Sequence, residues 1–199
     1  MPIKSERQYR NAEFRAKEDE SYIVEGYATT WERYPLYDYG DRIIYEQFSR
    51  ENFAGTQMDD VIFQYDHNGK VYARMSNGTL KLSFDDHGLK VVADLSLTES
   101  SRQMYEEIKA GLVTKMSWGF LPNGLPEFDE DTSTITWKEG IRRIYDVSCV
   151  SVPANDTTEI SARSACDGVI ASTLEEFKKA QEIEEARKRM IAILTLEGV

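Results

Sequence analysis

The sequence has little cysteine and no long apolar run, and both shortages exclude broad classes of protein. Cysteine occurs only at Cys149 and Cys166, which is too few for a disulfide framework or a structural zinc site. No window approaches the roughly 18 apolar residues that a membrane-spanning helix needs. Residues 1–20 also lack the apolar segment of a secretory signal. We therefore expect a protein of a reducing compartment that does not associate with membranes.

Positive charge is also scarce. The chain of 199 residues carries 24 Lys and Arg against 35 Asp and Glu, a formal net charge of -11. Phosphate contacts require clusters of Lys and Arg, so this balance argues against binding of nucleic acid. Hydrophobic residues make up 41% of the chain, which is enough for one sizeable core with appendages.

Alternating apolar residues and turn signals predict a mainly β fold. Strands are expected at 21–31, 41–48, 60–70 and 112–122, and hairpins at 78–97 and 134–154. A short helix is expected at 49–55 and a longer one at 98–111, while 123–133 would form an acidic loop. Many short strands in a core of about 130 residues suggest a closed barrel or a sandwich.

The C-terminal segment 174–196 has helical composition. Its apolar residues recur at spacings of three and four, and they are Phe177, Ala180, Ile183, Ala186, Met190 and Ile193. This pattern predicts an amphipathic helix. Its apolar stripe would either dock on the core of the same chain or bind a partner protein or a second copy.

The chain offers only two histidines as general bases. His87 lies in "FDDHGL", at the expected tip of a hairpin, where exposure to solvent is the simplest interpretation. His67 follows the apolar strand "VIFQYD", and the end of a strand is a suitable place for a general base. A turn residue without a chemical role would fit this position as well.

Ser117, in "VTKMSWGF", is the candidate nucleophile. A serine hydroxyl needs a base within hydrogen-bond reach and donors for the developing oxyanion. His67 could be that base, and Gly119 could allow a substrate carbonyl to approach closely. The segment is not the Gly-x-Ser-x-Gly nucleophile elbow, so on its own it also fits a serine on the polar face of a strand.

A third group should orient the base, and the candidates are Asp66, Asp146 and the acidic loop. Asp66 adjoins His67, and neighbours on a strand point to opposite faces. Asp146 lies within "RRIYDVSCVSV", where burial of an acid is costly unless it is paired. Arg142 or Arg143 could be its partner in a purely structural ion pair.

A wider resemblance is carried by five segments, which are "EFRAKEDESYIVEGYATTW", "YDHN", "GTLKLSFDDHGLKVVADL", "MSWGF" and "IYDVSCVSVPA". In this order and spacing, over about residues 13–160, they resemble the prohead (capsid maturation) proteases of tailed bacteriophages. The resemblance implies a fold similar to the herpesvirus assemblin proteases, mainly β with helices (α+β). We therefore expect a small closed antiparallel β-barrel flanked by helices in residues 1–160, followed by a polar linker and the amphipathic helix in 161–199.

The resemblance also implies the site residues of a serine endopeptidase. Ser117 would be the nucleophile, His67 the base and Asp146 the third member of the triad. The expected oxyanion or substrate residues are Trp118, Gly119, Arg142 and Arg143, the arginines by analogy with the paired arginines of assemblins. No cofactor and no metal are implied.

The implied substrates are the scaffolding segment of the major capsid protein, any separate scaffold, and the protease itself. Cleavage would occur inside the assembling prohead, in the host bacterial cytoplasm, and self-association could use the C-terminal helix. One alternative is a non-enzymatic capsid assembly or scaffold protein. Another is a metal hydrolase built on His67, His87 and nearby aspartates, although their spacing matches no established ligand pattern.

Overall fold

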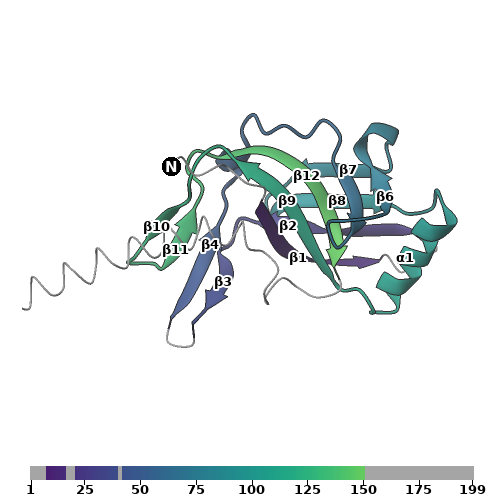
Figure 1. The fold of residues 1–199 in the computed structure, drawn as a ribbon, viewed down its shortest axis with the longest axis horizontal. Helices are drawn as coiled ribbons and strands as arrows, with labels where there is room; N and C mark the ends of the chain where they lie inside the picture. Colours follow the sequence, from purple (N-terminus) through teal and green to yellow (C-terminus); the bar gives the residue numbers. More distant parts are fainter. Residues whose placement is uncertain (1–7, 17–20, 40–41, 151–199) are drawn as a thin grey trace, which may run out of the picture.

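The computed structural model describes residues 8–16, 21–39 and 42–150, most of them in two β-sheets (Figure 1). In spatial order, the larger sheet contains β6 (Val71–Arg74), β5 (Ile62–Tyr65), β12 (Ile141–Val150), β9 (Lys115–Pro122), β1 (Gln8–Ala16), β2 (Ile23–Thr30), β8 (Gly88–Asp94) and β7 (Leu80–Phe84). The smaller sheet contains β10 (Glu127–Asp129), β11 (Thr134–Thr136), β4 (Ile43–Gln47) and β3 (Tyr34–Asp38). The smaller sheet and helix α1 (Glu99–Lys109) lie at opposite ends of the larger sheet (Figure 1).

The larger sheet is open, so the expectation of a closed barrel was wrong. Its edge strands are β6 and β7, and closure would require hydrogen bonds between first and last strands. These two strands are consecutive in the chain, but the 3-10 helix η2 (Met75–Asn77) and the left-handed Gly78 separate them. The chain therefore does not make the tight turn that would pair them as a hairpin.

The expectation of several flanking helices also needs correction. Among the described residues, α1 is the only α-helix, accompanied by the 3-10 helices η2 and η1 (Arg50–Phe53). No helix in this part of the chain is long and apolar enough to cross a membrane. The expected helix in 174–196, and the boundary between 1–160 and 161–199, lie outside the described residues.

Several elements follow the sequence pattern. The hairpin expected at 78–97 is formed by β7 and β8, with Leu82 opposite Val91. The helix expected at 98–111 is α1, in which the Thr98 side chain accepts a hydrogen bond from the backbone N–H of Ser101. Such an N-cap satisfies one of the free donors of the first turn.

Other elements do not follow the pattern. β1, which the sequence did not predict, lies between β9 and β2 in the larger sheet. The loop expected at 123–133 contains β10, and 134–154 is not a hairpin, because β11 pairs with β10 and β4 while β12 pairs with β9 and β5. Pairing between strands distant in sequence, and not local turn signals, therefore decides this part of the fold.

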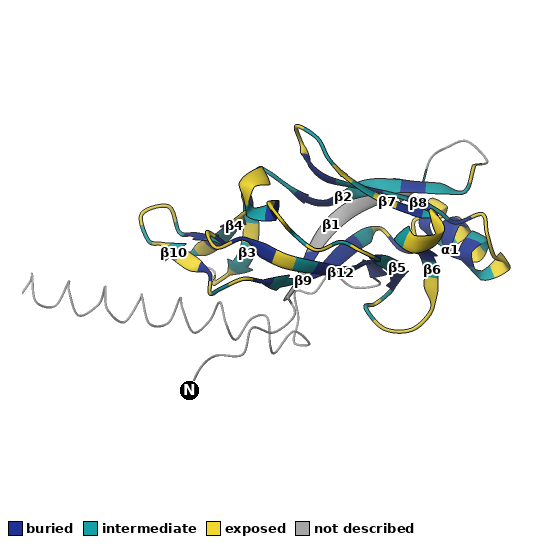
Figure 2. Ribbon diagram, turned by 90° about the horizontal axis from the view of Figure 1, so that it is seen from above, coloured by how far each residue is buried: buried dark blue, intermediate teal, exposed yellow. Residues whose placement is uncertain are grey.

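The core lies on one face of the larger sheet, and Figure 2 shows buried positions concentrated along β9 and β12. Trp118 stacks on Phe120 with ring centroids 4.4 Å apart, and Phe48 meets both rings edge-on. Successive side chains of a strand point to opposite faces. Since Trp118 and Phe120 face the core, their neighbours Ser117 and Gly119 face the other side.

Candidate active site

His67 is held by a tight turn directly after β5. The backbone N–H of Asn68 donates to the carbonyl of Tyr65 at 3.1 Å, and the two central residues, Asp66 and His67, have φ of 46° and 55°. Positive φ at both central positions is typical of a type I′ turn. Residues other than glycine rarely adopt this conformation, and such strain often occurs at functional sites.

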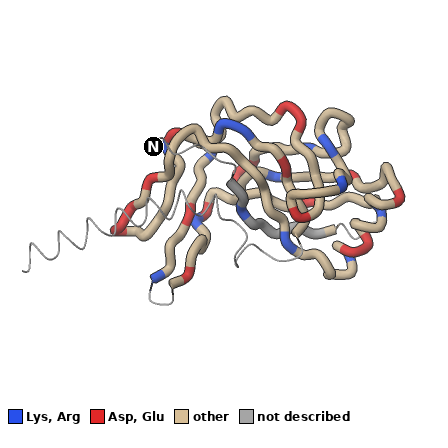
Figure 3. The backbone as a smooth tube through the Cα atoms, in the orientation of Figure 1, with Lys and Arg blue, Asp and Glu red and all other residues tan. Residues whose placement is uncertain are grey.

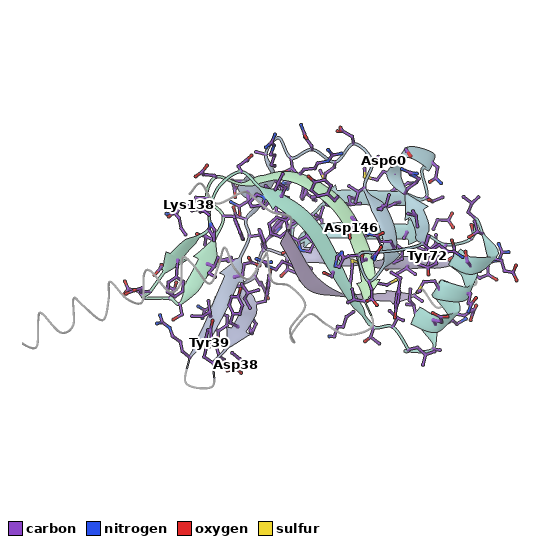
Figure 4. The ribbon with its side chains drawn as sticks, viewed as in Figure 1. Asp38, Tyr39, Asp60, Tyr72, Lys138 and Asp146 are labelled. Carbon is purple, nitrogen blue, oxygen red and sulfur yellow. The ribbon has the colours of Figure 1, made fainter. Side chains whose placement is uncertain are left out.

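The turn places the His67 imidazole in contact with Asp146 of β12, and Figure 4 marks the position of Asp146 in the larger sheet. Nδ1 of His67 and Oδ1 of Asp146 are 2.5 Å apart. The Asp146 side chain is fully buried, whereas that of His67 is 17% exposed. β12 runs parallel to β5, with Asp146 level with Ile62, so residues at the end of β5 lie beside the residues that follow Asp146.

Ser117 lies on the neighbouring strand, β9. Its Cα is paired with that of Ser148 on β12, and Gly119 is paired with Asp146. Directly opposed residues of antiparallel strands have side chains on the same face, as do residues two apart on one strand. Ser117, Ser148 and Asp146 therefore share one face of the sheet.

The Ser117 hydroxyl is buried and unsatisfied. The residue is 1% exposed, and its Oγ has no hydrogen-bond partner among the described residues. Because most buried hydroxyls are paired, an exception needs a specific explanation. A nucleophile, which gives its proton to a general base only as it attacks the substrate, is one such explanation.

The four expected oxyanion or substrate residues lie in different surroundings. The Trp118 side chain packs in the aromatic core, on the opposite face from Ser117, with the Phe53 ring centroid 5.8 Å away. Gly119 lies on the Ser117 face, where it adds no side chain. The Trp118 side chain is thus directed away from that face, and only its backbone remains a candidate for contact with substrate.

The two arginines lie near the start of β12. Arg142 is exposed, and the guanidinium of Arg143 lies 5.0 Å from the ring centroid of Tyr145. Bulges in the β9–β12 pairing fall between Ile141 and Arg143 and again before Asp146. These bulges break the simple alternation that would set Arg142 and Asp146 on one face, and Asp146 instead pairs with His67.

The remaining chemically versatile residues lie apart from this group or are inert. His87 is exposed at the tip of the β7–β8 hairpin, where its ring packs edge-on against Tyr27. Burial raises the pKa of the Cys149 thiol to about 12. Within the described ranges, no three His, Cys, Asp or Glu side chains gather as a metal ion would require.

Sequence reasoning missed Ser148. Its hydroxyl is fully buried and donates a hydrogen bond of 2.8 Å to Oδ1 of Asp146. The available signal was its spacing, since Asp146 and Ser148 are two residues apart on one strand and thus share a face. Nothing in the sequence showed that Ser117 lies on the adjacent strand at the same level.

Comparison with known protein families matches the chain to the family that its sequence resembles. The family model described as caudovirus prohead serine protease matches residues 10–179, well over half of the chain. The matched range includes His67, Ser117 and Asp146. No curated protein and no solved structure matches the chain.

Proposed function

Because the chain belongs to the caudovirus prohead serine protease family, we propose that it cleaves head proteins by acyl transfer at Ser117. As a prohead protease, it acts inside the assembling prohead and associates with phage capsid proteins. One observation carries the assignment of residues. The imidazole of His67 contacts the buried carboxylate of Asp146, on the face of the sheet to which Ser117 belongs.

The reaction would proceed in two halves. Ser117 Oγ attacks the scissile carbonyl, and Nε2 of His67 accepts the hydroxyl proton, since Nδ1 faces Asp146. The protonated imidazole then gives this proton to the leaving amine, which leaves an acyl-enzyme for water to hydrolyse by the same route. Asp146 holds the proton on Nδ1 and stabilises the imidazolium formed in each half.

The oxyanion of each tetrahedral intermediate would be stabilised by donors close to Ser117. Backbone N–H groups at Trp118 and Gly119 are the first candidates, and glycine permits close approach of the substrate. Arg142 and Arg143 are the second candidates, as charged donors at the start of β12. The core position of the Trp118 ring favours a role for its backbone over its side chain.

The proposed substrates are the scaffolding segment of the major capsid protein, any separate scaffold, and the ends of the protease itself. Residues 161–199, as an amphipathic appendage, would bind the scaffold or a second copy of the protease. Assembly would take place in the cytoplasm of the host bacterium. Confinement of the reaction to the prohead would limit damage to host proteins.

Co-expression with the capsid protein tests the proposal. With Ser117→Ala or His67→Ala, full-length capsid protein should persist, because neither variant can complete acyl transfer. Mass spectrometry of the capsid protein would report both trimming and the positions of cleavage. Trimming that continues in either variant would show that the assignment of that residue is wrong.

Two matched variants control for the substitution itself. Ser83→Ala changes an exposed serine on β7, and His87→Ala changes the exposed histidine of the same hairpin. Both should trim capsid protein as the unmodified protease does. If they also fail, the loss in the first pair of variants reflects folding or expression instead of chemistry.

A further inference from the structure

The Ser148 hydroxyl donates a hydrogen bond to the Asp146 carboxylate. Its Oγ donates to Oδ1 at 2.8 Å, and Nδ1 of His67 meets the same oxygen atom at 2.5 Å. Ser148 and Asp146 are both 0% exposed, so no solvent competes for this hydrogen bond. In such surroundings a hydrogen bond to a charged acceptor is strong, and its loss leaves the charge less well satisfied.

This geometry distinguishes Ser148 from the nucleophile, although Ser117 is its direct neighbour across the β9–β12 pair. A nucleophilic hydroxyl must donate to the base in order to be activated. The Ser148 hydroxyl donates to the acid instead, whereas Ser117 Oγ has no hydrogen-bond partner among the described residues. The two serines therefore differ in role.

We propose that Ser148 is a positioning residue of the site, whose hydroxyl fixes the Asp146 carboxylate and moderates its attraction for the His67 imidazole. This inference rests on the proposed function for its catalytic meaning. The contacts themselves do not depend on it. Ser148 acts through Asp146 and does not touch the reacting atoms.

The physical consequence has a definite sign. The Ser148 hydrogen bond takes up part of the negative charge of the carboxylate. Without it, the carboxylate attracts the protonated imidazole more strongly, so His67 stays protonated to a higher pH. Since only the neutral imidazole can act as a base, the acidic limb of the pH–rate profile moves to higher pH.

Other titratable groups lie on the elements next to the site, and the test requires that the substitution leave them unchanged. Asp66 and Tyr65 belong to the turn and to β5, Cys149 to β12, Glu107 to α1, Tyr72 to β6 and Lys115 to β9. Substitution of Ser148 changes none of them. A shift in the behaviour of His67 can therefore be assigned to the lost hydroxyl.

The decisive measurement is the titration of the two histidines by NMR, made on the full chain with Ser117→Ala to prevent self-cleavage. Adding Ser148→Ala should raise the midpoint of the His67 titration by about 0.5–1 pH unit, while that of the exposed His87 stays unchanged. In the active protein, kcat/KM on the acidic limb should fall by about 3- to 10-fold, the same shift expressed as a rate. The plateau at higher pH should fall less.

Two further variants separate positioning from packing. Ser148→Thr keeps a hydroxyl and should return both the His67 midpoint and the acidic limb towards their original values. Ser101→Ala removes another buried serine hydroxyl, one that donates to the carbonyl of Tyr72 at 2.9 Å, and should lower stability without moving the His67 titration. If Ser148→Thr does not fold, Ser148→Cys, a near-isosteric weak donor, should give an intermediate midpoint.

An unchanged His67 midpoint in Ser148→Ala would overturn the proposal, even if activity fell, because it would leave only a packing role. Failure of the proposed function would look different. Capsid protein would still be trimmed by Ser117→Ala, whatever the His67 titration showed. Complete loss of activity in Ser148→Ala at every pH, with normal folding, would also contradict a positioning role.

Discussion

At the scale of single residues, a carboxylate buried as deeply as that of Asp146 is unfavourable unless donors satisfy it. Here the imidazole of His67 and the hydroxyl of Ser148 both approach Oδ1. If Asp146 is ionised, the contact with His67 is a hydrogen bond only when Nδ1 carries the proton. Nε2 then has the lone pair that a general base needs.

Asp146→Asn tests this dependence on the carboxylate. An amide in place of the carboxylate can stabilise the wrong tautomer of His67, with the proton on Nε2, and it cannot balance the charge of the imidazolium. We expect kcat for cleavage of the capsid protein to fall by about 10²- to 10⁴-fold. The fold itself should persist, because the two side chains have the same shape.

Asp66→Asn is the matched control. It makes the same chemical change at an exposed residue adjacent to His67 in the chain, and it should leave kcat within about twofold of the original. Activity of Asp146→Asn equal to that of the unmodified protein would remove Asp146 from the site. A large loss in Asp66→Asn alone would transfer the role to that residue.

At the scale of structural elements, the two sheets are joined by a buried ionic cluster around Glu46 of β4. Arg10 of β1 donates to both carboxylate oxygens, and Trp137 Nε1 donates to Oε1 at 2.7 Å. The Tyr34 hydroxyl of β3 donates to Oε2. Burial, and then the Glu46 charge, hold the pKa of Tyr34 well above its usual range, so that its phenol remains a donor.

Glu46→Gln should therefore destabilise the whole molecule. The substitution removes the negative charge and leaves Arg10, which is 5% exposed, next to a neutral amide. Breaking a buried ion pair from one side typically costs about 3–5 kcal/mol, and we expect a loss of that order in the free energy of unfolding. Urea unfolding monitored by tryptophan fluorescence would measure it.

A surface ion pair gives the comparison. Glu127 of β10 pairs with Lys138, and both side chains are more than half exposed. Glu127→Gln should change the free energy of unfolding by less than about 1 kcal/mol, because exposed pairs are screened by water and salt. Equal effects of the two substitutions would show that the Glu46 cluster does not join the sheets as described.

At the scale of the whole molecule, the candidate site depends on the overall fold, because its residues come from three separate parts of the chain. β5, β9 and β12 are adjacent only through one parallel and one antiparallel pairing. Acidic and basic residues are interspersed over both sheets (Figure 3), while the buried side chains of these strands form one apolar core. Opening of that core would separate the site residues.

The Cys149 thiol reports such opening. Burial, as the largest cause, raises its pKa from 9.0 to about 12, so at pH 8 the reactive thiolate fraction is about a thousandfold lower than in the unfolded chain. In a Cys166→Ser variant, a disulfide reagent should label the folded protein very slowly and the urea-unfolded protein at once. Rapid labelling of the folded protein would contradict the closed core.

The raised pKa of the Cys149 thiol also predicts how the stability of the fold depends on pH. Since the folded-state pKa of Cys149 is raised, its contribution is fully present below about pH 9 and is lost as the pH rises towards 12. Urea unfolding of Cys149→Ser should lack this part of the alkaline decline. Serine is the suitable replacement because it is similar in shape and does not ionise in this range.

Sequence patterns suffice for elements whose contacts are local. The β7–β8 hairpin and α1 are local structures, each specified by its own apolar period and its own turn or cap residues, and both were predicted. β1 was missed because polar and charged residues make up most of "QYRNAEFRA", which obscures the alternation typical of a strand. The proposed hairpin at 134–154 was wrong because long-range pairing with β9 and β5 took precedence over the local turn.

By itself, the sequence determined the family and the mainly β composition, and it identified Ser117 and His67 as candidates, since these follow from motif order and local periodicity. Only the tertiary structure decided that Asp146 contacts His67, that Ser148 donates to the same carboxylate oxygen, and that the larger sheet stays open. Each of these depends on strand register, which is set by packing between segments distant in the chain. A single sequence carries no local signal for such register.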